Sequence, residues 1–91
     1  MEYAWDDLKS AGNLAKHGVS FEIVKGFDWL KAMEYAQDHD GEVRWKAFSW
    51  IGGVLHCLVY THREPDITRV ISLRKATPKE RKFYEKNTPK T

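Results

Sequence analysis

Hydrophobic residues recur at two different spacings along this chain, and the spacing changes near residue 32. Over residues 8–16 apolar side chains return every three or four positions, which predicts a helix that buries them against the rest of the protein. These side chains are Leu8, Ala11, Leu14 and Ala15. Asp6 or Asp7 is a suitable N-cap for this helix, and His17-Gly18 is typical of a helix end.

A second, shorter helix is predicted over about residues 21–29. Ser20 is a suitable N-cap, and Phe21, Val24 and Phe27 follow one another at three-residue steps. Side chains at this spacing share one face of a helix, so these three are expected to be buried.

The end of the chain predicts a third helix, from residue 78 to about residue 86. In Thr77-Pro78-Lys79-Glu80 the threonine is an N-cap, the proline suits the first helical position, and the glutamate completes a capping box. Phe83 is expected to face inward as the main anchor, with Tyr84 beside it. Residues 87–91 are expected to fray.

From residue 32 onward the hydrophobic period is two, which is typical of strands. Four strands are predicted, over residues 32–38, 42–51, 54–61 and 67–73. Hairpin turns are indicated at 38–41 and at Gly52-Gly53, and residues 62–66 form the third connection. Residues 2–5 are compatible with one more brief strand.

The last strand is expected to have one covered and one basic, solvent-facing side. Strict alternation places Thr68, Val70, Ser72 and Arg74 on one side, and Ile67, Arg69, Ile71 and Leu73 on the other. The predicted fold class is α+β: an antiparallel sheet of about four strands with two N-terminal helices and a C-terminal helix. With 91 residues, the chain is expected to form a single domain over 1–91.

Composition excludes several classes of protein. Cys57 is the only cysteine, so the chain forms no internal disulfide and no cysteine-rich zinc site. No apolar run approaches the length of a membrane span, and the first residues lack a secretory signal pattern, so a cytoplasmic protein is expected.

The net charge of +2 is unevenly distributed. Residues 74–91 contain seven basic and two acidic side chains, whereas residues 1–73 contain eight basic and eleven acidic ones. A basic segment on a slightly acidic body suits an anionic partner, either nucleic acid or an acidic protein. The alternative is a solvated helix face followed by a frayed tail, and charge alone favours neither reading.

The candidate chemistry does not involve a cofactor. The four histidines, His17, His39, His56 and His62, lack the spacing of a metal site, and serine-nucleophile, phosphate-loop and dinucleotide motifs are absent. What remains is a set of cationic and proton-transferring side chains: Lys16, His17, Arg44, Arg63, Arg69, Arg74, Lys75, Arg81 and Tyr84. Cleavage of RNA without metal needs a base, an acid and fixed positive charge at the phosphate. Composition does not separate such a site from a binding surface.

Several of these residues also have an ordinary structural interpretation. His17 is a normal residue for a helix end, Arg63 for an exposed turn, and Tyr84 for the edge of a core. For Arg74 the functional interpretation is stronger than for the other residues, because the end of a strand holds a side chain rigidly.

An ordered series of motifs resembles the BrnT-like toxin family of bacterial type II toxin–antitoxin systems. The series covers about residues 3–85 and consists of Trp5-Asp6, Lys9, Asn13, Lys16-His17-Gly18-Val19-Ser20-Phe21-Glu22, Arg44, Ile51-Gly52, Val59-Tyr60-Thr61-His62-Arg63, Arg69-Val70-Ile71-Ser72-Leu73-Arg74-Lys75-Ala76, Glu80-Arg81 and Tyr84. The resemblance implies a RelE-like fold and ribonuclease activity that slows translation and growth. It also implies a BrnA-like ribbon–helix–helix antitoxin, which neutralises the toxin and contacts operator DNA as part of the complex.

These observations together predict a metal-independent endoribonuclease. Arg63 and Arg74 are expected to hold the scissile phosphate, and His17, assisted by Lys16 or Tyr84, to transfer protons. Flanking phosphates are expected to contact Arg44, Lys75 and Arg81. The expected partners are RNA and the antitoxin, with a homodimer or a 2:2 complex as possible assemblies.

Two alternatives remain open at this point. The chain could be a non-enzymatic module that binds nucleic acid or protein through its basic sheet face and C-terminal helix. It could also be a purely structural partner that completes the fold of an antitoxin.

Overall fold

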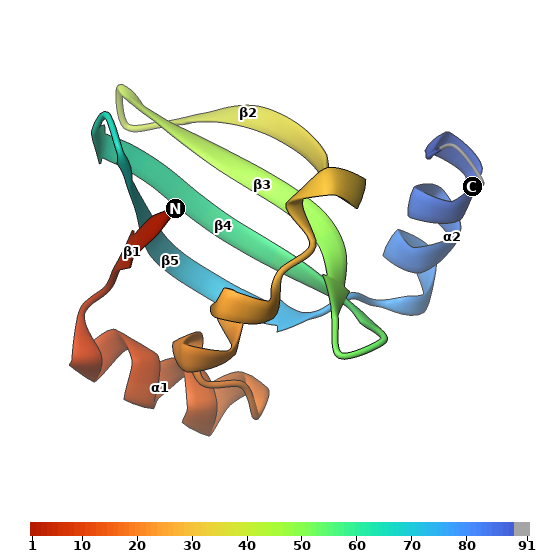
Figure 1. Ribbon diagram of the computed structural model, residues 1–91, viewed down its shortest axis with the longest axis horizontal. Helices are drawn as coiled ribbons and strands as arrows, with labels where there is room; N and C mark the ends of the chain where they lie inside the picture. Colours follow the sequence, from red (N-terminus) through yellow and green to blue (C-terminus); the bar gives the residue numbers. More distant parts are fainter. Residues whose placement is uncertain (89–91) are drawn as a thin grey trace.

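The protein forms a five-stranded mixed sheet with helical segments on one face and a helix at one end (Figure 1). The computed structural model describes residues 1–88, with the exception of the side chain of Arg63. In chain order, the elements are β1 (Glu2–Ala4), α1 (Asp7–His17), the 3-10 turns η1 (Phe21–Gly26) and η2 (Trp29–Lys31), β2 (Met33–His39), β3 (Glu42–Ile51), β4 (Val54–Glu64), β5 (Ile67–Lys75) and α2 (Pro78–Asn87).

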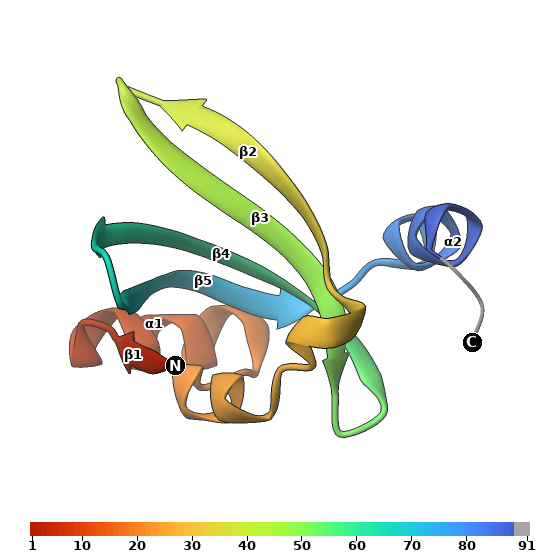
Figure 2. The ribbon, with the colours of Figure 1, turned by 45° about the horizontal axis from the view of Figure 1, so that its top comes forward.

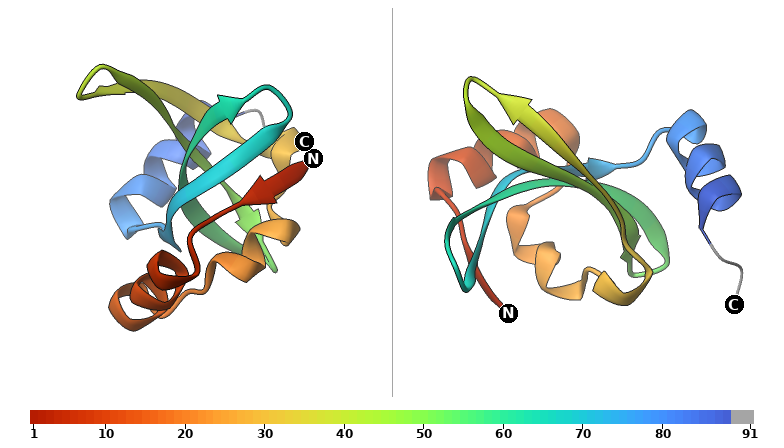
Figure 3. Two further views of the ribbon diagram at one scale, coloured as in Figure 1. Left: turned by 90° about the vertical axis from the view of Figure 1, so that its left-hand side faces the viewer. Right: turned by 90° about the horizontal axis from the view of Figure 1, so that it is seen from above.

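The four predicted strands form the antiparallel meander β2–β3–β4–β5, and the α+β class is confirmed. The prediction of a purely antiparallel sheet of about four strands was wrong, because β1 pairs in parallel with β5 as a fifth strand. Figure 3 (left) shows β1 beside β5 at the edge of the sheet. With three residues, β1 is too short to show a hydrophobic period of two. Its partner β5 also lies more than 60 positions away, so the sequence does not indicate the pairing. The third connection is also shorter than predicted, because β4 continues to Glu64.

The first helix has the predicted caps but buries the opposite face. The Asp6 carboxylate accepts hydrogen bonds from the backbone N–H groups of Leu8 and Lys9, and Gly18 adopts a left-handed conformation. The prediction that the apolar side chains are buried was wrong: Leu8 is 84% exposed and Leu14 is 51% exposed. The buried residues of α1 are Ser10 and Asn13.

The reason is that α1 lies against backbone and not against an apolar surface. Asn13 donates to the carbonyls of Val19 (2.7 Å) and Leu73 (2.6 Å) and accepts from the Leu73 N–H (3.3 Å). The Ser10 hydroxyl accepts from the N–H of Phe21 (3.1 Å). Polar side chains are therefore required on the inner face, where they satisfy buried backbone groups.

The predicted second α-helix is instead a pair of short 3-10 turns, η1 and η2, so the prediction of an α-helix over 21–29 was wrong. Its apolar residues repeat at three-residue steps, which is the period of the 3-10 helix. The expected burial of Phe21, Val24 and Phe27 is confirmed, and they join residues of β3, β4 and β5 in the larger core.

The two faces of the sheet differ in how they are covered. Figure 2 shows α1 and the 3-10 turns below the sheet, and α2 beyond its end. The covered face contains the larger core, whose sheet residues are Ala47, Leu58, Tyr60, Val70 and Leu73. A smaller core of Phe48, Leu55, Cys57, Ala76 and Tyr84 lies near α2. The rest of the face opposite α1, called here the open face, has no helix over it in the part of the chain described (Figure 3, right).

A β-bulge in β5 changes which side chains share a face. Val59 is opposite Ser72, but Tyr60 is opposite Val70, so Ile71 is the additional residue. Strict alternation therefore fails, and the predicted grouping of Thr68 and Val70 with Ser72 and Arg74 was wrong. Val70 and Leu73 both enter the larger core, while Ser72 and Arg74 point to the open face.

The C-terminal helix begins as predicted. The Thr77 hydroxyl accepts from the N–H of Glu80, and the Glu80 carboxylate accepts from the N–H of Thr77, which completes the capping box. The predicted anchor was wrong: Tyr84 is buried, whereas Phe83 is 49% exposed. Of the tail predicted to fray, Asn87 is helical and Thr88 hydrogen-bonds to the Tyr84 carbonyl, and residues 89–91 lie outside the described part.

Candidate functional site

Three neighbouring strands carry cationic side chains that face the open side of the sheet. Cross-strand pairing places Phe48 opposite Cys57, and Cys57 opposite Arg74. Two pairs along, and therefore on the same face, Lys46 is opposite Val59. Arg44 precedes Lys46 by two positions in β3 and therefore faces the same way. Arg44, Lys46 and Arg74 are called the basic cluster below.

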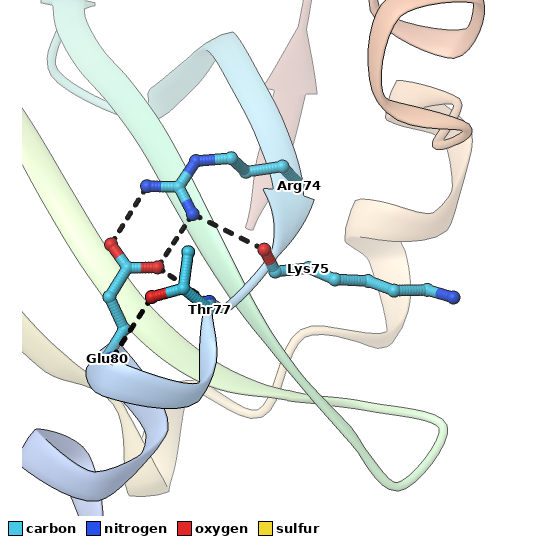
Figure 4. A network of polar contacts seen from close by, with 4 residues as sticks. All are labelled: Arg74, Lys75, Thr77 and Glu80. Atoms are coloured by element: carbon cyan, nitrogen blue, oxygen red, sulfur yellow. Dashed lines mark hydrogen bonds and ion pairs between the residues drawn. The ribbon is translucent and has the colours of Figure 1, made fainter.

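Arg74 is held by an acidic residue of α2 (Figure 4). Its Nη1 donates to Glu80 Oε1 at 2.7 Å, and its Nη2 donates to Glu80 Oε2 at 2.9 Å. The two side chains are only 27% and 21% exposed. The hydrogen bonds from Arg74, together with that from the Thr77 N–H, lower the pKa of Glu80 from 4.5 to about 2, and the same contact raises the pKa of Arg74. The pair is therefore fully ionised at neutral pH.

The contacts of Arg74 leave part of its guanidinium available. A guanidinium has five N–H donors. Two are used by Glu80 and a third, on Nη1, by the Lys75 carbonyl at 3.3 Å. The Nε–H and the second Nη2 hydrogen make no hydrogen bond to the described residues, and Figure 4 shows Nε without a contact. These two donors form a complete fork, the geometry that binds two oxygens of a phosphate.

The other two members of the cluster add positive charge. The charge of Lys46 acts electrostatically on both Glu80 and Cys57, where it favours the ionised form of each side chain. Arg44 has a buried Nε with no hydrogen-bond partner among the described residues. Lys46 and Arg44 thus add positive charge to the face that carries the Arg74–Glu80 pair.

Two further groups with displaced pKa values are structural. Cys57 lies in the smaller core, and burial raises the pKa of its thiol, which disfavours the thiolate that a nucleophile requires. Burial and a hydrogen bond to Glu34 raise the pKa of Tyr60 well above its usual range. Tyr60 belongs to the larger core on the covered face.

The predicted site residues are distributed over several parts of the fold. Arg74 and Arg44 face the same side of the sheet, but Arg44 lies four positions along β3 from Phe48, the residue in line with Arg74. Lys75 points away from Arg74 because neighbours in a strand face opposite sides. Arg81 is exposed on α2. The backbone of Arg63 lies in β4, two residues beyond Thr61, and not in the predicted turn. Its side chain is outside the described part.

The proton-transfer candidates belong to the two α-helices and make their own contacts. The Tyr84 hydroxyl donates to the Lys31 carbonyl at 2.7 Å and accepts from Trp50 Nε1 at 3.2 Å. Lys16 and the half-buried His17 are in the last turn of α1. No contact among the described residues joins His17 or Tyr84 to Arg74.

Sequence reasoning missed two members of this site, Lys46 and Glu80. Lys46 had a detectable signal, since it alternates with Arg44 in a strand. Glu80 was recognised as a capping residue and as part of the motif series, but not as the partner of Arg74, because nothing in the sequence shows that the start of α2 lies against β5. The described residues contain no group of three or more His, Cys, Asp or Glu side chains that could hold a metal ion. They also contain no helix long and apolar enough to cross a membrane.

Comparison with known proteins identifies the class to which this fold and basic site belong. Residues 5–80 match the family described as the ribonuclease toxin, BrnT, of type II toxin–antitoxin systems. The chain therefore belongs to the BrnT family of ribonuclease toxins, as the motifs predicted. Such a toxin has an antitoxin as its protein partner and RNA as its substrate.

A solved relative supports the same conclusion. The fold is similar to the 1.1 Å crystal structure of the Brucella abortus ribonuclease toxin, BrnT, with a TM-score of 0.70 and 28% sequence identity. The match covers 85% of this chain and 97% of that one. A comparison with curated protein sequences gave no match.

Proposed function

We propose that this toxin is a metal-independent endoribonuclease whose scissile phosphate binds to Arg74. The observation that carries the proposal is the free Nε/Nη2 fork of Arg74 on the open face, fixed in place by Glu80. Arg74 remains charged at every relevant pH and can hold two phosphate oxygens at once. Lys46 adds positive charge beside it, and Arg44 adds positive charge further along the same face.

The proposed reaction is an attack by the ribose 2′-hydroxyl on the adjacent phosphorus. A base removes the 2′-hydroxyl proton, the new O–P bond forms, and the bond to the leaving 5′-oxygen breaks as that oxygen takes up a proton. The products are a 2′,3′-cyclic phosphate and a 5′-hydroxyl. The phosphate gains negative charge in the transition state, and a preorganised guanidinium stabilises that charge without having to reorient.

Roles for the remaining residues are proposed from the sequence, except that of Tyr84, which follows from its contacts. Arg63 is proposed to assist Arg74, and His17 with Lys16 to transfer protons. The Tyr84 hydroxyl donates a hydrogen bond to the Lys31 carbonyl. This contact favours a role in positioning α2 over a role in proton transfer. Arg44, Lys75 and Arg81 are proposed to contact flanking phosphates.

The proposed cellular setting follows from the family. The domain is proposed to be a RelE-like toxin of the cytoplasm that slows translation. Its antitoxin would be a BrnA-like ribbon–helix–helix protein that brings the complex to operator DNA. The assemblies to test are a homodimer of the toxin and a 2:2 complex with the antitoxin.

The test is incubation of the purified protein with labelled single-stranded RNA in EDTA, with and without antitoxin. Cleavage should give cyclic phosphate ends and should stop when antitoxin is added. Arg74→Lys keeps a positive charge near Glu80 but removes the fork, so its cleavage should fall strongly at a temperature where it is folded. Lys79→Ala, which changes an exposed cation of α2, is the matched control.

Two results would contradict this assignment. If Arg74→Lys cleaved as fast as the unmodified toxin, Arg74 would not hold the scissile phosphate. If RNA were bound with a steep salt dependence but stayed intact, the chain would be the binding module of the alternative reading.

A further inference from the structure

Two aromatic side chains are exposed next to the basic cluster although they come from distant parts of the sequence. Tyr35 in β2 is 39% exposed, and Phe83 in α2 is 49% exposed. Their ring centroids are 6.2 Å apart, with the ring planes tilted by 38°. Tyr35 also contacts Phe48 edge-on, at 6.4 Å between centroids. Solvent therefore reaches a contiguous aromatic surface.

Each of the two rings lies next to a residue of the proposed phosphate site. Tyr35 is the cross-strand partner of Lys46, so the two lie on the same face of neighbouring strands, about 5 Å apart in backbone. Phe83 follows Glu80 by three positions, which places both on the same side of α2. A nucleic acid strand whose phosphate contacts Lys46 or Arg74 would thus have a neighbouring base within reach of Tyr35 and Phe83.

The two exposed rings are not needed to attach α2 to the sheet. The helix is already held by the buried Tyr84, whose hydroxyl makes two hydrogen bonds, and by the Arg74–Glu80 pair. A single exposed apolar residue would be unremarkable. Two adjoining rings beside a cationic cluster combine the two features of single-strand binding sites, a positive track for the backbone and aromatic faces for the bases.

We propose that Tyr35 and Phe83 form a stacking platform for one unpaired nucleobase of the RNA. The platform binds the base of a nucleotide adjacent to the phosphate held by the basic cluster. This inference rests on the proposed function, which it extends from the phosphate to the base. Stacking accepts any of the four bases, so the platform selects single-stranded over paired RNA and discriminates little among sequences.

The experiment measures the binding of short single-stranded oligonucleotides with 2′-O-methyl riboses, which lack the attacking hydroxyl and stay intact. One position at a time carries 2-aminopurine, whose fluorescence is quenched when it stacks, or an abasic residue. The variants are Phe83→Ala and Tyr35→Ala, with Phe83→Tyr and Tyr35→Phe as matched controls that keep the ring. Thermal melts establish that each variant is folded, and Tyr35→Ala carries the test if Phe83→Ala is not.

Quenching is expected at one position, and Phe83→Ala should weaken binding by roughly 5- to 150-fold. The ring-preserving variants should bind like the unmodified protein. An abasic residue at the quenched position removes the contact with both rings and should weaken binding at least as much, and it should cause a smaller further loss in Phe83→Ala than in the unmodified protein. The slope of log affinity against log salt should stay unchanged in Phe83→Ala, whereas Arg44→Ala should lower it by about 0.7 unit, the value for one phosphate contact of a single strand.

Equal binding by Phe83→Ala and Phe83→Tyr, or independent losses from the variant and the abasic residue, would overturn the platform. So would equally tight binding of duplex RNA. If binding is salt-dependent but no position is quenched, the phosphate site stands and the platform fails. If quenching and the ring variants behave as expected but unmodified RNA is not cleaved, the platform stands and the nuclease proposal fails.

Discussion

Neutralising Glu80 provides a direct test of how the basic cluster is held together. In Glu80→Gln the amide oxygen can still accept from the Thr77 N–H, so the capping contact is retained. The amide nitrogen, however, would face a nitrogen of the Arg74 guanidinium. Both groups are hydrogen-bond donors, so no hydrogen bond can form between them. The variant therefore removes the charge of the Arg74–Glu80 pair while disturbing the start of α2 as little as possible.

The expected loss follows from the pKa of Glu80. Its pKa is 4.5 ordinarily and about 2 in the folded protein. A lowered folded-state pKa stabilises the protein above the unfolded-state value, so the pair contributes about 3 kcal/mol at pH 7. This stabilisation is lost as the pH falls from about 5 toward 2, and about 1 kcal/mol remains at pH 3. A domain of this size has a total stability of roughly 5–14 kcal/mol, so the change is readily measured.

The assay is urea denaturation of the toxin and of Glu80→Gln at several pH values between 7 and 3. The unfolding free energies should differ by about 3 kcal/mol at pH 7 and converge as the pH falls. Glu85→Gln, an exposed acid on the same helix, is the matched control and should follow the unmodified protein. A difference that stays constant over this pH range would refute the reasoning, because the loss would not depend on ionisation of Glu80.

Two other variants test contacts that place α1 and α2. Asn13→Ala leaves the Val19 and Leu73 carbonyls and the Leu73 N–H without their partner, so unfolding free energy should fall by about 1–3 kcal/mol, measured by urea denaturation. The solvent-side change Leu14→Ala should have a much smaller effect, and equal losses would contradict the inverted orientation of α1. Tyr84→Phe removes the hydroxyl contacts with Lys31 and Trp50 and should lower stability by about 1–2 kcal/mol, while RNA cleavage by the folded protein is unchanged. A slower cleavage step with an unchanged melt would instead give the Tyr84 hydroxyl a role in proton transfer.

Local signals in the sequence predict most elements of the fold because the physics behind them is local. The Gly52-Gly53 turn has both residues at positive φ, as a two-residue hairpin requires, and the strands on either side follow from it. The Thr77 capping box fixes the start of α2 in the same way. Each depends on neighbours only a few residues apart.

The orientation of elements was less predictable, because it depends on what each element meets. Leu8 and Leu14 define an apolar face of α1, yet the helix lies against backbone groups near β5 and turns its polar side inward. In β5 one additional residue, Ile71, reverses the alternation that would place Ser72 and Arg74 on the covered face. The sequence does not reveal this bulge, since apolar residues fall at plausible positions whether the strand is regular or bulged.

The site depends on contacts between distant segments, and this limits what the sequence indicates about it. Arg74 was identified from its place at the end of a strand, but its availability for phosphate depends on which of its donors Glu80 occupies. Tyr35 and Phe83 are 48 positions apart and have no common motif. Their proximity results from the position of α2 beside β2 and β3, which only the folded chain establishes.

One helix connects these features of the site. Glu80, Phe83 and Tyr84 occupy positions i, i+3 and i+4 of α2, so one side of the helix carries the acid that holds Arg74, the exposed ring and the buried anchor. The orientation of the Arg74 fork, the base platform and the stability of the helix therefore all depend on the packing of α2 against the sheet. A change that releases α2 should affect all of them together, whereas Phe83→Ala should affect only the base. The structure thus separates variants that remove one contact of the RNA from variants that dismantle the site.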